Sequence, residues 1–135
     1  MRIVALLLLV SPVIAQSPPF MPVATVSEIM DAITLPYSDA LVYIQRDPPK
    51  NDRDWEMLQM QALMLAESGN LLMMNDRARN QGEWMKDARE LVDVGMAAVR
   101  ATRAKDIQAV VALNERIVDS CITCHMKFRS GRSEK

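Results

Sequence analysis

The chain has few of the residues that build reactive centres. Its 135 residues include one histidine and two cysteines, so a zinc site built on these three would need a carboxylate as its fourth ligand. Nucleophile–base arrangements, paired carboxylates and phosphate-binding loops are all absent from the sequence. We therefore expect no catalytic residues and a protein that is not an enzyme.

An excess of one charge and long apolar runs are also lacking. The net charge of −1 is not the strongly basic balance of a nucleic-acid-binding protein. The apolar run at residues 3–10 is too short to cross a bilayer. With Arg2 before it and Ala15 after it, this run predicts a secretory signal peptide over residues 1–15. No cysteine lies beside the cleavage site at Ala15, so we expect a periplasmic or otherwise exported protein without a membrane anchor.

The sequence also lacks the period-two alternation that indicates strands, and helical spacing takes its place. The first predicted helix begins near Thr25 or Ser27 and carries Met30 on its inward face. Pro36 should kink or split it. Three further helices are predicted over about residues 51–75 and 81–102 and from Asp106 onward.

Short loops between these four helices predict antiparallel neighbours. The expected fold is therefore all-α, an up-down-up-down four-helix bundle over residues 23–130. An extended arm at residues 16–22 precedes it, and a flexible tail at residues 131–135 follows it. The last helix is expected to carry its inward face on Ile107, Val111, Asn114, Val118, Cys121 and His125.

The segment CITCH contains both cysteines and the only histidine. Cys121 and Cys124 are three residues apart and His125 follows, which is the spacing of covalent c-type haem attachment. Two thiols one helical turn apart can each form a thioether to the same porphyrin, and the imidazole can then bind its iron. The motif predicts one covalent haem c.

Other interpretations of the two thiols compete with haem attachment. A thioredoxin-like pair would lie in a βαβ unit, and no strand is predicted here. A zinc site would need the carboxylate ligand noted above, and a plain disulfide leaves His125 without a role. A haem-free module that uses Cys121 and Cys124 as a dithiol stays an alternative.

The segments CITCHMKFR and VSEIMDAI resemble the class II c-type cytochromes, that is, the cytochrome c prime group and its low-spin relatives. The attachment motif near the C-terminus distinguishes this group from class I cytochromes. The resemblance implies that Cys121 and Cys124 form the thioethers and that His125 is the proximal iron ligand. It also implies that Arg129 lies near a haem propionate.

The residue opposite His125 decides between two functions. Of the 11 methionines, the bundle topology leaves Met30, Met73, Met74 and Met85 near the haem end. The resemblance to low-spin members implies that Met30 is the distal iron ligand. The protein is then expected to be an electron carrier that serves redox partner proteins. An open distal side, or a Met30 that a gas can displace, would favour a cytochrome that binds carbon monoxide or nitric oxide. Bundles of the family that it resembles often dimerise through their first two helices, so the resemblance is compatible with a homodimer.

Overall fold

The computed structural model describes residues 20–74 and 76–129, and all regular structure within these ranges is helical. The prediction of an all-α chain is confirmed. The predicted signal peptide at residues 1–15, most of the arm at residues 16–22 and the tail at residues 131–135 lie outside the described residues.

The first helical rod begins at the predicted cap residue Thr25. The Glu28 amide donates to Thr25 Oγ1 at 3.2 Å, and the Thr25 amide donates to Glu28 Oε2 at 2.8 Å, which together form a capping box. The rod consists of α1 (Val26–Ile29), a π-helical turn η1 (Met30–Thr34) and α2 (Leu35–Val42).

The disturbance expected at Pro36 takes the form of the π turn. The Leu35 amide donates to the Met30 carbonyl, five residues back, so the helix is wider directly before the proline. A proline ring in a regular α-helix collides with the carbonyl four residues earlier, and a wider turn moves that carbonyl away. The rod thus continues past Pro36, and Met30 stands at the start of its irregular turn.

The middle of the chain forms two long helices, α3 (Asp52–Leu72) and α4 (Glu83–Arg103). Asn51 caps α3 as predicted, with its Oδ1 accepting from the Asp54 amide at 3.0 Å. Gly95 lies where the two backbones meet. A Cβ added there would stand 2.7 Å from the Ala66 Cα, so only glycine allows this approach.

The last predicted helix is divided at Leu113 into α5 (Ile107–Ala112) and α6 (Asn114–Phe128). Asn114 directly follows the break, and its Nδ2 donates to the Val42 carbonyl at the end of α2 at 2.8 Å. Asn114 is partly buried, and this bond joins the start of α6 to the first rod.

The predicted inward face of the last helix is confirmed except at one position: five of its six residues are partly buried, and Val118 is exposed. Val118 is 40% exposed, and the buried residues of α5 and α6 are Val110, Ile117 and Ser120. The fully buried positions lie one residue before the predicted ones on both sides of Leu113, at Val110, Ile117 and Ser120. Cys121 and His125 consequently lie half-buried at the edge of that face.

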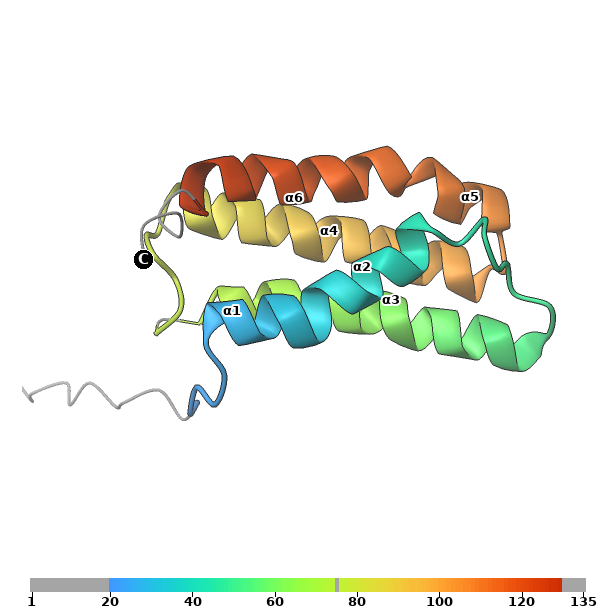
Figure 1. Cartoon of the computed structure of the whole chain (residues 1–135), viewed down its shortest axis with the longest axis horizontal. Helices are drawn as coiled ribbons and strands as arrows, with labels where there is room; N and C mark the ends of the chain where they lie inside the picture. The colour runs from blue at the N-terminus through green and yellow to red at the C-terminus, as the bar shows by residue number, and fades with distance from the viewer. Residues whose placement is uncertain (1–19, 75, 130–135) are drawn as a thin grey trace, which may run out of the picture.

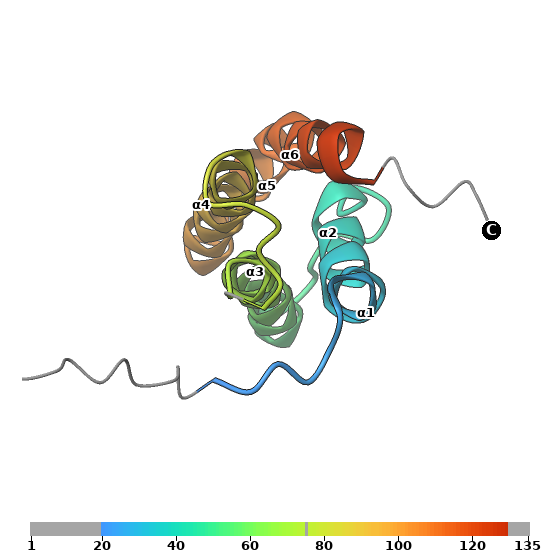
Figure 2. The ribbon, with the colours of Figure 1, turned by 90° about the vertical axis from the view of Figure 1, so that its left-hand side faces the viewer.

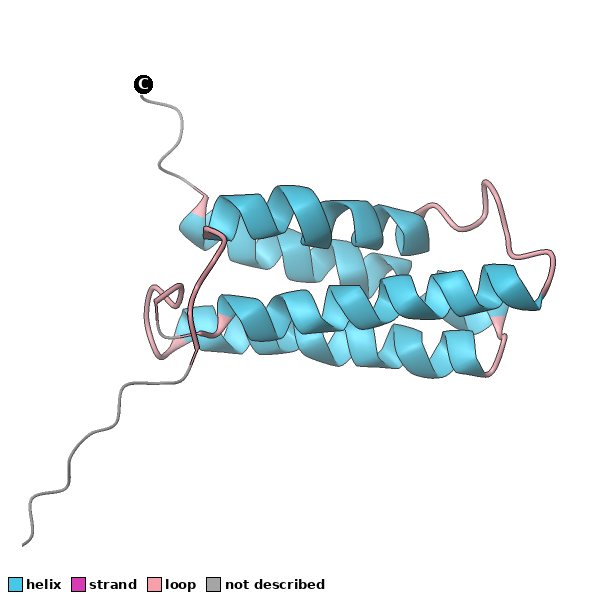
Figure 3. Cartoon of the chain, turned by 90° about the horizontal axis from the view of Figure 1, so that it is seen from below, coloured by secondary structure: helices cyan, strands magenta, loops and turns pink. Residues whose placement is uncertain are grey.

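The helices form four rods that lie side by side (Figure 1). Seen end-on, the α1–α2 rod, α3, α4 and α6 surround a common centre (Figure 2). The α1–α2 rod packs against α3 and α6, and α4 packs against α3 and the α5–α6 rod. The loops lie at the two ends of the molecule (Figure 3).

Fully buried apolar side chains from all four rods fill the centre: Ile29, Leu41, Leu65, Val94, Val99, Val110 and Ile117. Within the described residues, no helix has the length and apolarity that crossing a membrane requires.

Candidate functional site

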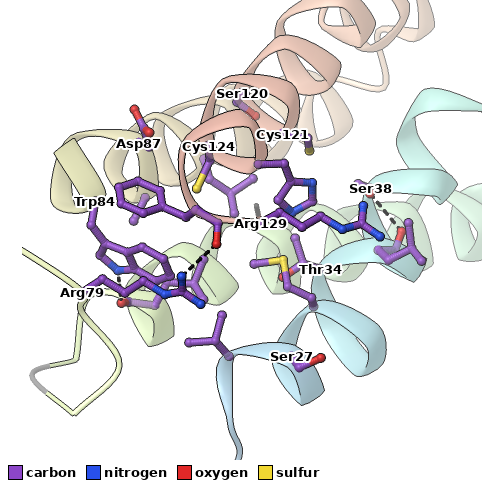
Figure 4. A pocket seen from close by; sticks show the side chains of 18 of the residues that line it. Ser27, Thr34, Ser38, Arg79, Trp84, Asp87, Ser120, Cys121, Cys124 and Arg129 are labelled. Carbon is purple, nitrogen blue, oxygen red and sulfur yellow. Dashed lines mark hydrogen bonds between the residues drawn. The ribbon is translucent and has the colours of Figure 1, made fainter. Parts of the chain in front are cut away.

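A cavity of about 380 Å³ opens at one end of the rods. Its lining comes from the first rod, from the end of α3, from the start of α4 and from the end of α6. Figure 4 shows this space, with side chains converging on it from several helices. The volume is in the range of sites that hold small molecules and cofactors.

Cys121, Cys124 and His125 all line this cavity from α6. The residues are three and one apart, so they occupy one side of the helix within little more than a turn. Figure 4 shows the Cys124 sulfur directed into the space beneath α6. Both cysteines are free thiols, so the structure contains no disulfide between them. The three residues of the CITCH motif thus meet at one site.

Burial changes the ionisation of these three groups. It raises the pKa of the Cys124 thiol to about 11, with the negative charge of Asp87 as the next cause, and it also raises the pKa of Cys121. Burial and the nearby Arg129 cation lower the pKa of His125. At neutral pH the thiols are therefore protonated and the imidazole is neutral, which is the form that binds metals. Redox-active dithiols instead have a lowered pKa, so this environment does not favour the dithiol alternative.

Met30 lines the cavity from the first rod, across from the motif. The described lining includes none of the other methionines that topology placed at this end: Met73, Met74 and Met85. Thr34, one turn after Met30, also lines it, and its buried Oγ1 has no hydrogen-bond partner. An unpartnered buried hydroxyl beside a cavity is the condition expected where a bound group completes the site.

Two aromatic side chains form an apolar wall. Trp84 is 3% exposed, and its Nε1 donates to the Leu72 carbonyl at 2.7 Å. The Phe128 ring meets it edge to face, with centroids 5.0 Å apart. Both residues line the cavity, so core burial of Trp84 and contact with a bound group are compatible.

Two arginines line the same cavity. Arg129, named by the resemblance, follows α6, and its amide donates to the His125 carbonyl at 2.9 Å. Arg79 was not predicted from the sequence. Its Nη1 donates to the Phe128 carbonyl at 2.8 Å and its guanidinium lies 5.6 Å from the Trp84 ring centre. Arg79 belongs to a loop between helices, and no spacing pattern marks such a residue before the chain is folded.

Comparisons with protein-family models, curated proteins and solved structures found no match to this chain. The functional interpretation therefore rests on the cavity itself.

The side chains that line the cavity differ in how well they suit a zinc ion and a haem. Within residues 20–74 and 76–129, no three His, Cys, Asp or Glu side chains gather into a set that could hold a metal ion, so a zinc site finds no ligand set there. The cavity instead offers two thiols, one imidazole and one thioether between apolar walls, with two guanidinium groups. These residues fit a largely apolar group that carries carboxylates and brings further ligands for its own metal, as a haem does.

Proposed function

We propose that this protein is an exported mono-haem c-type cytochrome, an up-down-up-down four-helix bundle that carries single electrons. One observation carries the proposal: Cys121, Cys124 and His125 line the same cavity as Met30. Met30 belongs to the first rod and the other three residues to α6, and all four line the same cavity.

Each residue has a defined task in this proposal. Cys121 and Cys124 hold the haem through thioether bonds, His125 binds the iron as proximal ligand, and Met30 binds it as distal ligand. The bound haem supplies an iron that accepts and releases one electron. A thioether is a soft ligand, so Met30 favours the ferrous state and raises the reduction potential.

The walls of the cavity support this chemistry. Leu72, Trp84, Ala88 and Leu91 present apolar surface to the bound group and exclude water from it. Arg79 and Arg129 provide guanidinium groups suited to carboxylates, because their planar array of donors matches a carboxylate in two places.

The cellular setting follows from the same proposal. We infer that residues 1–15 are removed during export, that the mature protein has no lipid or membrane anchor, and that its partners are redox proteins. A homodimer is part of the proposal through the family resemblance. Three exposed methionines lie on α3: Met57, Met60 and Met64. Substitutions at these residues can test whether two copies of the chain associate through this surface.

Covalent haem attachment is the first prediction. Expressed with a c-type haem maturation system, the wild-type chain should keep its haem on a denaturing gel, because thioether bonds survive unfolding. A Cys121→Ala, Cys124→Ala variant should lose the stain. Wild-type protein that gives no haem stain would contradict the proposal and favour the dithiol alternative.

The ligand opposite His125 is tested by visible spectra of the reduced protein with and without carbon monoxide. We expect sharp reduced bands that carbon monoxide leaves unchanged, and Met30→Ala should make the iron high-spin and reactive toward carbon monoxide. Met85→Ala is the matched control, because Met85 is outside the described lining of the cavity and should leave the spectrum unchanged. A wild-type spectrum that shifts with carbon monoxide would favour the gas-binding alternative.

A further inference from the structure

Asp87 is a buried carboxylate in the wall between two spaces. Its side chain is 5% exposed, and it lines both the cavity and a groove of about 500 Å³ between α4 and the α5–α6 rod. A carboxylate loses much of its hydration on burial and remains charged only when it is paired. The function proposed above gives Asp87 no task.

Lys127 on α6 is the partner of Asp87. Its Nζ donates to both carboxylate oxygens at 3.1 Å, and Glu83 Oε2 lies 3.6 Å from the same nitrogen. The Lys127 side chain is 31% exposed. The ion pair therefore joins a buried anion to a cation that is in contact with solvent.

The pair is oriented relative to the cavity. Asp87 lines the cavity and the groove, whereas Lys127 lines the groove and is outside the described lining of the cavity. The residue that carries the negative charge thus borders the cavity, and the residue that carries the positive charge does not belong to its described lining.

We propose that the Asp87–Lys127 pair sets the reduction potential of the haem, with Asp87 lowering the potential and Lys127 raising it. The inference rests on the function proposed above. A negative charge near the iron favours the ferric state, which carries one more positive charge than the ferrous state. Water and salt screen a buried charge much less than an exposed one, so Asp87 should act more strongly than the surface carboxylates.

The experiment is an equilibrium redox titration of the haem-loaded protein, followed by its visible spectrum. Asp87→Asn keeps the shape of the side chain and removes its charge, so the potential should move to a more positive value. Lys127→Gln leaves Asp87 uncompensated and should move the potential to a more negative value. The double variant should lie between the two single variants, nearer to the wild type.

Glu83→Gln is the matched control. It removes the same charge and contacts the same lysine, but its side chain is 68% exposed and it is outside the described lining of the cavity. Its shift should be clearly smaller than that of Asp87→Asn.

Equal shifts for Asp87→Asn and Glu83→Gln, or a Lys127→Gln shift of the same sign as that of Asp87→Asn, would overturn the inference. If Asp87→Asn does not retain haem, Lys127→Gln alone tests the inference. An unchanged potential in Lys127→Gln would then overturn it. Haem-loaded variants with unchanged potentials reject this inference alone. A wild-type chain without covalent haem rejects the proposed function and this inference with it.

Discussion

Trp84 links the stability of the fold to the wall of the cavity. Its indole donates to the Leu72 carbonyl at 2.7 Å, and Leu72 is the last residue of α3. The same ring meets Phe128 on α6, so one side chain joins the ends of three helices. No local pattern in the sequence indicates that the Leu72 carbonyl accepts the hydrogen bond of Trp84.

Trp84→Phe should therefore destabilise the protein. It removes the donor and leaves the buried Leu72 carbonyl without this partner, which costs about 1–3 kcal/mol of unfolding free energy. Urea unfolding followed by circular dichroism measures the change. Trp55→Phe, at a half-buried position, is the control and should cost less. Equal losses in the two variants would contradict the importance given to the Trp84 hydrogen bond.

At the scale of the elements, the contact between α3 and α4 depends on glycine. A Cβ at Gly95 would lie within 2.8 Å of the Ala66 Cα, N and Cβ atoms, and two of these belong to a helical backbone that cannot rotate away. The sequence alone makes Gly95 look like a weak point of a predicted helix. The packing shows the opposite, because this residue permits a close approach of the two helices.

Gly95→Ala should lower the free energy of unfolding by about 1–3 kcal/mol, because α3 and α4 must separate to accommodate the methyl group. Thermal or urea unfolding measures it. Gly82→Ala is the control, since the nearest atom to an added Cβ there is Asn80 Oδ1 at 3.6 Å. A Gly95→Ala protein as stable as Gly82→Ala would show that the two helices are not held this closely.

The start of α1 gives a pH-dependent prediction. Hydrogen bonds from the Thr25 amide and hydroxyl lower the pKa of Glu28. A lowered pKa means that the stabilisation is present above the ordinary glutamate pKa of about 4.3 and is lost as the pH falls through the lowered value. Glu28→Gln should therefore differ from the wild type in urea unfolding more at pH 7 than at pH 3. An equal difference at both pH values would show that the ionised carboxylate does not stabilise the cap.

At the scale of the whole molecule, the cavity connects cofactor binding to stability. The cavity between the rods has a volume of about 380 Å³ and a mostly apolar lining. An apolar wall gains contacts when a bound group fills the space. We expect the haem-loaded protein to unfold at a temperature higher by more than about 5 °C than the haem-free chain, a difference on the order of 1 kcal/mol or more.

Calorimetry on wild-type protein produced with and without haem maturation measures this difference. Cys121→Ser, Cys124→Ser is the control, and under both conditions its melting temperature should be close to that of the haem-free wild type. A wild-type chain with the same melting temperature with and without covalent haem would show that the cavity gains nothing on filling.

The sequence by itself determined the helical class and the disturbance at Pro36, and it narrowed the first cap to Thr25 or Ser27 and the second to the region of Asn51. Cap chemistry and proline geometry act within a few residues, so local sequence is enough to specify them. The spacing of Cys121, Cys124 and His125 is equally local, and it identified the motif before the fold was known.

The tertiary structure alone decided which side chains meet. It selected Met30 over three other methionines as a lining residue, brought Arg79 to Phe128, and paired Asp87 with Lys127. It also showed that the fully buried positions of the last helix lie one residue before the predicted ones, at Val110, Ile117 and Ser120. These contacts join residues tens of positions apart, and their geometry is fixed by packing between rods that no local pattern encodes.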